Sequence, residues 1–218
     1  MKPRALLIDL DDTLYDERTY VLSGFQAVAA GLAERFPGLH AGLVFEAMVA
    51  ELDTNGRGEV FDRVLAEAGL RAEVGELVQM YREHPPHIAL WPGVADTLTE
   101  LRREHRIAIV TDGLGVMQRR KVAALRVEPL VDAVLYCWEH ESPKPHPGPY
   151  AEALRRLSVT PEEAVVIGDN PAHDIAAARA LGCRSVRVLT GRFTAEPGQA
   201  DATVASFTEV PAVLGSLA

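Results

Sequence analysis

Three aspartates directly follow the first apolar run of the chain, in the segment Asp9-Leu10-Asp11-Asp12. The preceding run Ala5-Leu6-Leu7-Ile8 has the composition of a buried strand, which predicts that these carboxylates lie at the end of a sheet, where α/β proteins bind ligands. Carboxylates this close repel one another at neutral pH unless a cation or a shared proton offsets the repulsion. The spacing therefore indicates a metal site, with an acidic turn after a strand as the alternative.

Two later apolar runs also end in polar residues. Residues 107–110 are followed by a hydroxyl and two turn residues, Thr111-Asp112-Gly113. Residues 165–167 are followed by Gly168-Asp169 and, five positions after Asp169, by Asp174. These two predicted strand ends would add a hydroxyl donor and two further carboxylates to the acids of the first strand.

One lysine, Lys144, lies between these segments in a proline-stiffened loop, Ser142-Pro143-Lys144-Pro145-His146-Pro147. With it, the chain holds in order Asp-x-Asp-x-Thr, a strand-end Thr, a lone Lys and Gly-Asp-x-x-x-x-Asp. This ordered set resembles the four motifs of the haloacid dehalogenase superfamily of phosphohydrolases. Each later motif is weak alone, whereas the four together are specific, and the resemblance extends from Ala5 to about Val188.

The resemblance implies different roles for the acids of the first motif. Asp9 would be the nucleophile that attacks phosphorus and forms an aspartyl phosphate. Asp11 would protonate the leaving oxygen and then take a proton from the attacking water. Asp12 and Thr13 are expected to shape the turn rather than to take part in the chemistry.

The resemblance further implies that a hydroxyl and an ammonium group bind the phosphoryl oxygens. Thr111 would donate its hydroxyl, with Asp112 and Gly113 beside it in the substrate site, and Lys144 would supply a fixed positive charge. Arg57 lies in the helical block described below and is a further candidate for contact with an anionic substrate, since arginine is favoured at phosphate and carboxylate sites. The alternative for Arg57 is a solvated arginine at a helix start.

Magnesium is the cofactor that this resemblance implies. Mg²⁺ prefers octahedral oxygen coordination and keeps several waters, which fits a site with few protein carboxylates. Its ligands would be the side chains of Asp9 and Asp169 and the main-chain carbonyl of Asp11.

Asp174 has two interpretations. The resemblance places it behind the metal ligands, where it would orient a bound water or Lys144. Alternatively it is an acid in the first turn of a helix that is capped by Asn170 and begins at Pro171.

The chain after the first motif divides into a helical block and an alternating region. Apolar stripes at helical spacing, such as Val21, Phe25, Val28 and Leu32, predict four amphipathic helices between residues 17 and 87. The later alternation of helical and strand patterns predicts a parallel sheet wrapped by helices. Helices are expected at 94–105, 115–125, 147–157, 171–181 and from about 207, and strands at 107–111, 132–136, 164–168, 184–188 and 202–204.

The expected fold class is therefore α/β, with a Rossmann-like parallel sheet flanked by helices and an inserted all-helical cap. Residues 1–16 and 88–218 would form the catalytic core, and residues 17–87 the cap domain. A cap of this kind closes over a small substrate and excludes water during the reaction. The alternative is a packing subdomain without a gating role.

Composition limits the partners. The chain has 218 residues, with 22 Lys plus Arg against 31 Asp plus Glu and a net charge of −9, which argues against nucleic acid as a partner. Its N-terminus has no long apolar stretch, so neither a signal peptide nor a membrane span is expected and the predicted location is the cytoplasm. Two cysteines do not make a disulfide framework, and the oligomeric state cannot be inferred.

The preferred function is a Mg²⁺-dependent phosphatase for a small phosphate monoester, similar to phosphoglycolate phosphatases and 5′-nucleotidases. A phosphomutase shares the same core residues and stays open. A 2-haloacid dehalogenase needs no second catalytic acid or metal, so Asp11 and Asp169 argue against it. From a different class, a receiver-like phospho-accepting signalling module also combines clustered acids, Thr and Lys, but such modules are shorter and lack a helical block. The substrate itself cannot be read from the sequence.

Overall fold

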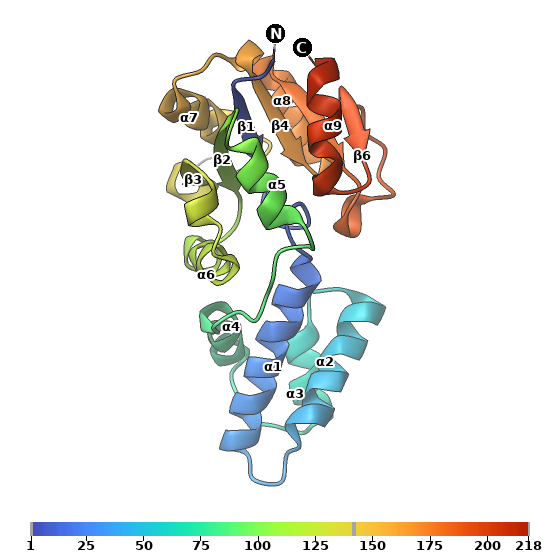
Figure 1. Ribbon diagram of the computed structural model, residues 1–218. Coiled ribbons are helices and arrows are strands. Elements are labelled where there is room, and N and C mark those ends of the chain that lie inside the picture. The colour runs from blue at the N-terminus through green and yellow to red at the C-terminus, as the bar shows by residue number, and fades with distance from the viewer. Residues whose placement is uncertain (1, 141–142, 218) are drawn as a thin grey trace. The chain divides into compact units, whose positions relative to one another are not determined.

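The computed structural model describes residues 2–140 and 143–217 and divides into two compact units (Figure 1). One unit comprises Met1–Glu17 and Ala89–Ala218, and the other comprises Arg18–Ile88. Ser142 of the predicted lysine loop lies outside the described residues. We call the first the sheet unit and the second the helical unit.

The sheet unit is built on six parallel strands in the order β3-β2-β1-β4-β5-β6. The central strand β1 is fully buried along its length, which its Ala-Leu-Leu-Ile sequence permits because both of its faces are covered by helices. The chain fills one side of β1 first and then crosses to the other side at β4, which creates a topological switch point between β1 and β4. The strands span Ala5–Ile8, Arg106–Thr111, Ala133–Tyr136, Ala164–Gly168, Arg184–Val188 and Ala202–Val204 for β1 to β6.

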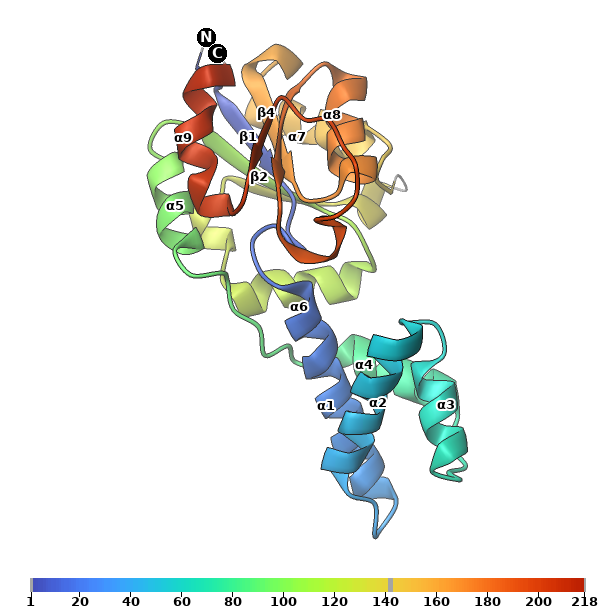
Figure 2. The same ribbon diagram turned by 90° about the vertical axis from the view of Figure 1, so that its right-hand side faces the viewer.

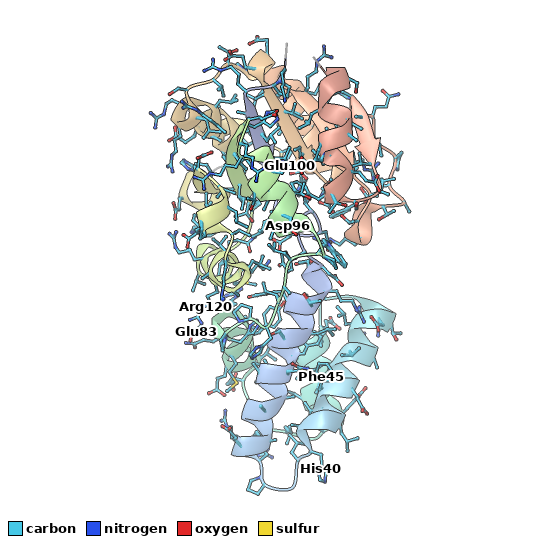
Figure 3. The ribbon with its side chains drawn as sticks, viewed as in Figure 1. His40, Phe45, Glu83, Asp96, Glu100 and Arg120 are labelled. Atoms are coloured by element: carbon cyan, nitrogen blue, oxygen red, sulfur yellow. The ribbon has the colours of Figure 1, made fainter. Side chains whose placement is uncertain are left out.

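Helices cover both faces of this sheet (Figure 2). On one face, α7 (Gly148–Leu157) and α8 (Ala176–Leu181) pack their apolar side chains on those of β1, β2 and β4. On the other lie α5 (Val94–Leu101) and α9 (Val210–Leu214), while α6 (Gly115–Leu125) follows β2. Figure 3 shows Asp96 and Glu100 one turn apart on α5; both are exposed, whereas Leu98 and Leu101 of the same helix are buried. This amphipathic pattern is what directs α5 onto the sheet.

The α/β prediction is confirmed, and the observed elements differ from those expected mainly at their ends. The helix expected at 94–105 ends at Leu101, because the chain then passes through short turns in which Arg103 and Glu104 bond three residues back. The helix expected at 171–181 begins with a π-helical turn over Pro171–Ile175 before α8. Widened turns of this kind are frequent at functional sites.

The helical unit contains α1 (Glu17–Arg35), α2 (Ala41–Asn55), α3 (Val60–Glu67) and α4 (Val74–Glu83). The expected stripe of α1 is buried, and it packs with apolar side chains of the other three helices. The buried members of this core are Val21, Phe25, Val28, Ala29, Leu32, Val44, Met48, Val60, Val64, Leu65 and Leu77. Among the described residues, no helix has both the length and the apolar character that crossing a bilayer requires.

Arg187 on β5 attaches the loop 191–200 to the carboxyl edge of the sheet. Its side chain is buried, and the guanidinium donates hydrogen bonds to the main-chain carbonyls of Phe193 at 2.6 Å and Glu196 at 2.8 Å. A longer contact of 3.4 Å joins its Nε to the carbonyl of Asp169 at the end of β4. One buried cation therefore connects the loop to the segment that carries Asp169.

We expect Arg187→Met to lower the free energy of unfolding by about 2–4 kcal/mol, because the loop carbonyls lose a charged donor inside the protein. The matched control is Arg184→Met on the same strand, where the side chain is 56% exposed and pairs with Asp201. That change should lower the free energy of unfolding by less than about 1 kcal/mol. Equal losses for both variants in urea unfolding would contradict the role assigned to Arg187.

Candidate active site

The strand register brings the predicted acids to one edge of the sheet. Ile8 of β1 pairs with Ile109 of β2 and with Ile167 of β4, so the segments that follow these three strands leave the sheet side by side. The main-chain N–H of Asp9 donates to the carbonyl of Ile167 at 2.9 Å, which extends this pairing by one residue. Asp9 and Asp169 therefore emerge next to each other at the switch point.

Lys144 lies at the centre of the site. Its Nζ contacts Asp9 Oδ1 at 2.5 Å and Asp174 Oδ1 at 2.8 Å, and its side chain is 2% exposed. Burial by itself would lower the pKa of Lys144, but the charges of Asp174 and Asp9 raise it well above its usual value. The group is therefore a fixed ammonium that bridges two carboxylates.

Asp174 is held by donors from three directions. Besides Lys144, the Tyr150 hydroxyl donates to Oδ1 at 2.7 Å, and the main-chain N–H of Asn170 donates to Oδ2 at 3.2 Å. Gly168 allows this approach, because a Cβ at that position would lie 2.3 Å from Asp174 Oδ2. The side chain is buried and turned toward Lys144, which matches the first of the two interpretations considered for it, the position behind the other acids.

The predicted cap of this segment is confirmed. The side chain of Asn170 accepts hydrogen bonds from the main-chain N–H groups of Ala172 at 3.0 Å and His173 at 3.2 Å. Pro171 occupies the first position of the turn, as expected for a residue that lacks an N–H. The cap fixes the π-helical turn from which Asp174 reaches Lys144.

Three carboxylates meet at this edge with ligand atoms within 4.8 Å of one another: Asp9, Asp169 and Asp174. Burial and the charges of Asp9 and Asp174 raise the pKa of Asp169 to about 9. Burial and the charges of Asp174 and Asp11 raise the pKa of Asp9 to about 7, although Lys144 acts in the opposite direction. Asp169 Oδ2 is buried and accepts no hydrogen bond from the described residues. The cluster thus carries more negative charge than Lys144 offsets, and it has one buried oxygen with no donor.

Asp11 is separate from this acidic cluster, because donors other than Lys144 bind both of its carboxylate oxygens. Lys121 Nζ contacts Oδ1 at 2.8 Å, the Tyr15 hydroxyl also donates to Oδ1, and Gln118 Nε2 donates to Oδ2 at 2.7 Å. Burial by itself would raise the pKa of Asp11, but the Lys121 charge and these hydrogen bonds lower it below its usual value. The side chain of Asp11 is therefore ionised and is not part of the acidic cluster.

The neighbours of Asp9 in the first motif shape the turn, as expected. Asp12 has a positive φ of 58°, and its Oδ1 accepts from the main-chain N–H of Glu17 at 3.0 Å, so it caps the start of α1. Thr13 also has a contact that was not expected, because its hydroxyl donates to Asp9 Oδ2 at 3.1 Å. Lys144 and Thr13 thereby hold one oxygen of Asp9 each.

The segment after β2 also reaches the site. Thr111 is fully buried, and its Oγ1 accepts a hydrogen bond from Gln118 Nε2 at 2.8 Å. Asp112 Oδ1 accepts from the N–H of Gly113 at 2.8 Å, and Oδ2 accepts from the main-chain N–H of Lys144 at 3.0 Å. Asp112 thus connects the loop after β2 to the lysine loop, a structural contact that the sequence analysis did not foresee.

A cavity of about 220 Å³ opens over the acids, Lys144 and Gly113, while Thr111 lies beneath its lining. Besides residues of the four motifs, its lining includes His173, Arg192 and Phe193, which the sequence analysis did not select. A larger cavity of about 700 Å³ is lined by Arg184 at the amino end of β5 and by Glu162 and Arg179. We assign the site to the smaller cavity because it contains the buried carboxylates and Lys144.

Arg57 belongs to the helical unit, where it is exposed in the segment between α2 and α3. The expected contact of Arg57 with a substrate stays a prediction.

Known proteins resemble this chain along most of its length. Residues 3–182 match the hydrolase family described as haloacid dehalogenase-like hydrolase. The chain is 31% identical over 201 residues to a glyceraldehyde 3-phosphate phosphatase of Methanopyrus kandleri, covering 87% of this chain and 85% of that protein. It is 30% identical over 228 residues to a phosphoserine phosphatase of Thermus thermophilus, covering 89% and 92%.

A solved structure agrees with these sequence relatives. The 2-haloacid dehalogenase of Pseudomonas syringae superposes with a TM-score of 0.68 at 25% identity, covering 99% of this chain and 100% of that one. The resemblance inferred from the four motifs is thereby confirmed. This chain belongs to the haloacid dehalogenase-like hydrolase family.

Proposed function

We propose that this protein is a phosphatase that hydrolyses a small phosphate monoester through a phosphoryl group carried on Asp9. The observation that supports this most is the position of the Asp9 carboxylate, which is held by Lys144 and Thr13 beside a cavity that Asp11 also lines. The sequence relatives named above are phosphatases of small phosphorylated molecules, which supports the same reaction class.

The acidic cluster fits a divalent cation. Asp169 Oδ2 is a buried oxygen without a donor, and the raised pKa values of Asp9 and Asp169 reflect negative charge that a cation would offset. Asp174 is less suited as a ligand, because Lys144, Tyr150 and the Asn170 N–H already occupy its oxygens. We assign Mg²⁺ to the side chains of Asp9 and Asp169 and the main-chain carbonyl of Asp11. When bound, Mg²⁺ would neutralise charge between these carboxylates and the phosphoryl oxygens.

In the first step, a carboxylate oxygen of Asp9 attacks phosphorus, the bond from phosphorus to the ester oxygen breaks, and Asp11 gives a proton to that oxygen. In the second step, water attacks phosphorus, Asp11 takes its proton, and inorganic phosphate leaves Asp9. The Lys144 ammonium and the Thr111 hydroxyl stabilise the negative charge on the phosphoryl oxygens in both steps. The ionised state of Asp11 in this structure is the one that the second step needs, and the first step starts from Asp11 that has taken up a proton.

The helical unit is inserted in the chain between β1 and β2, directly after the first motif. We propose that it acts as a cap that excludes water around a small substrate, with Arg57 as a candidate contact for the substrate. The proposed setting is the cytoplasm, without a nucleic-acid or membrane partner, consistent with the net charge of −9.

A dehalogenase is the second candidate, because a 2-haloacid dehalogenase is among the structural neighbours. Two acids argue against it. Asp11 has three donors in place around its carboxylate, and Asp169 has an oxygen that suits a cation, yet neither group is needed for attack of Asp9 on carbon.

Asp9→Asn should abolish phosphate release without unfolding the protein, because an amide is not a nucleophile and carries no charge for Mg²⁺. Release of phosphate from a panel of small phosphate esters with Mg²⁺ measures this. The control is Asp62→Asn, an exposed acid of the helical unit, which should keep wild-type turnover. If Asp9→Asn retained a tenth of the wild-type rate, the covalent mechanism would be wrong.

The raised pKa of Asp169 predicts how pH affects the metal-free protein. A carboxyl group whose pKa is higher in the folded than in the unfolded state stabilises the fold at pH values below its unfolded-state pKa. This contribution is lost as the pH rises through the folded-state pKa, which is about 9 for Asp169. The Tm without metal should therefore fall between about pH 6 and pH 9, and the increase in Tm on adding Mg²⁺ should be larger at the higher pH.

Asp169→Asn tests this assignment, because the amide keeps the shape and removes the charge. The metal-free variant should lose less stability with rising pH than the wild type, and Mg²⁺ should no longer raise its Tm. Asp62→Asn should behave like the wild type in both respects. An undiminished Mg²⁺ effect in Asp169→Asn would show that the metal is bound elsewhere.

A further inference from the structure

Two residues of α6 contact the site although they belong to none of the four motifs. Lys121 is 4% exposed and Gln118 is 2% exposed, and their spacing of three positions places them on one face of the helix. Both reach Asp11, with Lys121 Nζ at 2.8 Å from Oδ1 and Gln118 Nε2 at 2.7 Å from Oδ2.

A buried lysine at this position is not explained by stability. Removing an ammonium and a carboxylate from water costs several kcal/mol each, and an apolar pair of similar volume often stabilises a fold as well or better. If the residue at position 121 served only to pack α6 against the edge of the sheet, a leucine or methionine there would suffice. The ion pair with Asp11 is therefore better explained by what it does to the Asp11 carboxylate.

That carboxylate is fixed on both of its oxygens. Tyr15 and Lys121 donate to Oδ1 while Gln118 donates to Oδ2, so rotation about the side-chain bonds of Asp11 would break at least one contact. The Asp11 side chain is 24% exposed and lines the cavity, so it is restrained without being closed off from a substrate. Such restraint is what a proton donor needs in order to meet one leaving oxygen.

Gln118 connects Asp11 to the other side of the site. Its Nε2 also lies 2.8 Å from Thr111 Oγ1 and 2.5 Å from the carbonyl of Asp112, while its buried Oε1 accepts no hydrogen bond from the described residues. The two hydrogens of this amide are shared among three acceptors, and the Thr111 hydroxyl keeps its own proton for a further acceptor, which in the proposed function is a phosphoryl oxygen. One amide thus orients both the proposed acid and the proposed phosphoryl donor.

We propose that Lys121 and Gln118 are positioning residues, with Lys121 acting on the reaction through Asp11 and Gln118 coupling Asp11 to Thr111. The inference rests on the proposed role of Asp11 as acid and base. It implies a substrate class, because an acid held this firmly serves esters whose leaving oxygen needs a proton. Alkyl phosphates, such as phosphorylated hydroxy acids and sugars, belong to this class, and aryl phosphates do not.

The test compares an alkyl phosphate, glycerol phosphate, with an aryl phosphate, p-nitrophenyl phosphate. Lys121→Met should lower kcat for the alkyl ester on the order of 10- to 100-fold with little change in KM, and should affect the aryl ester much less. Lys121→Arg, which keeps the charge, should recover part of the loss. Arg119→Met, an exposed neighbour on α6, is the matched control and should leave both rates unchanged.

A double-mutant cycle separates positioning from a general structural effect. If Lys121 acts through Asp11, adding Lys121→Met to Asp11→Asn should lower the alkyl rate no further. Equal losses on both esters, or a double variant slower than Asp11→Asn alone, would overturn the proposal and assign Lys121 to phosphoryl binding or to the fold.

A stability measurement tests the inference independently of the proposed function. Urea unfolding of the wild type, both single variants and the double variant measures the coupling between Lys121 and Asp11 without any substrate. We expect a clear coupling, and its absence would overturn the positioning role whether or not the protein is a phosphatase. Failure of the phosphatase proposal would instead appear as phosphate release that survives Asp9→Asn.

Discussion

The contact of one buried ammonium with two carboxylates is the interaction on which the site depends. Asp9, Asp169 and Asp174 converge at the edge of the sheet, where burial makes their mutual repulsion strong. Lys144 lies between Asp9 and Asp174, and its own position is fixed by the bond from its main-chain N–H to Asp112. The side chain of Lys144 thus joins the loops after β1 and β4, and its main chain joins them to the loop after β2. Removing that charge would leave buried carboxylates without their partner, which is far less favourable than never having buried them.

The parallel sheet explains why residues far apart in sequence meet at this point. Strands that run in one direction present all of their carboxyl ends at one edge, and the switch between β1 and β4 opens a space there. The sequence was sufficient to predict this part, since each motif directly follows an apolar run and the order of runs implies a parallel sheet. It also predicted the Asn170 cap and the turn role of Asp12, because these depend on local spacing alone.

The contacts that the sequence did not reveal are those made across long distances or from the middle of a helix. A lysine in a helical pattern is normally solvated, so nothing local distinguishes Lys121 from Arg119 or Arg120, although Lys121 is buried against Asp11. Nothing in the sequence of the loop 191–200 marks it as part of the site, yet Arg187 binds its carbonyls and holds it at the cavity, where it contributes Arg192 and Phe193. The π-helical turn before α8 was likewise unpredictable from an N-cap signal that ordinary helices share.

The central claim is that Asp9 carries the phosphoryl group, and chemical trapping tests it most directly. The Asp11→Asn variant, which lacks the base for the second step, is mixed with p-nitrophenyl phosphate and Mg²⁺, quenched in acid and reduced with borohydride. An acyl phosphate on Asp9 would be reduced to homoserine, and mass spectrometry of the N-terminal peptide should locate that change at residue 9. Homoserine at another aspartate, or release of nitrophenol without any reduced aspartate, would contradict the account.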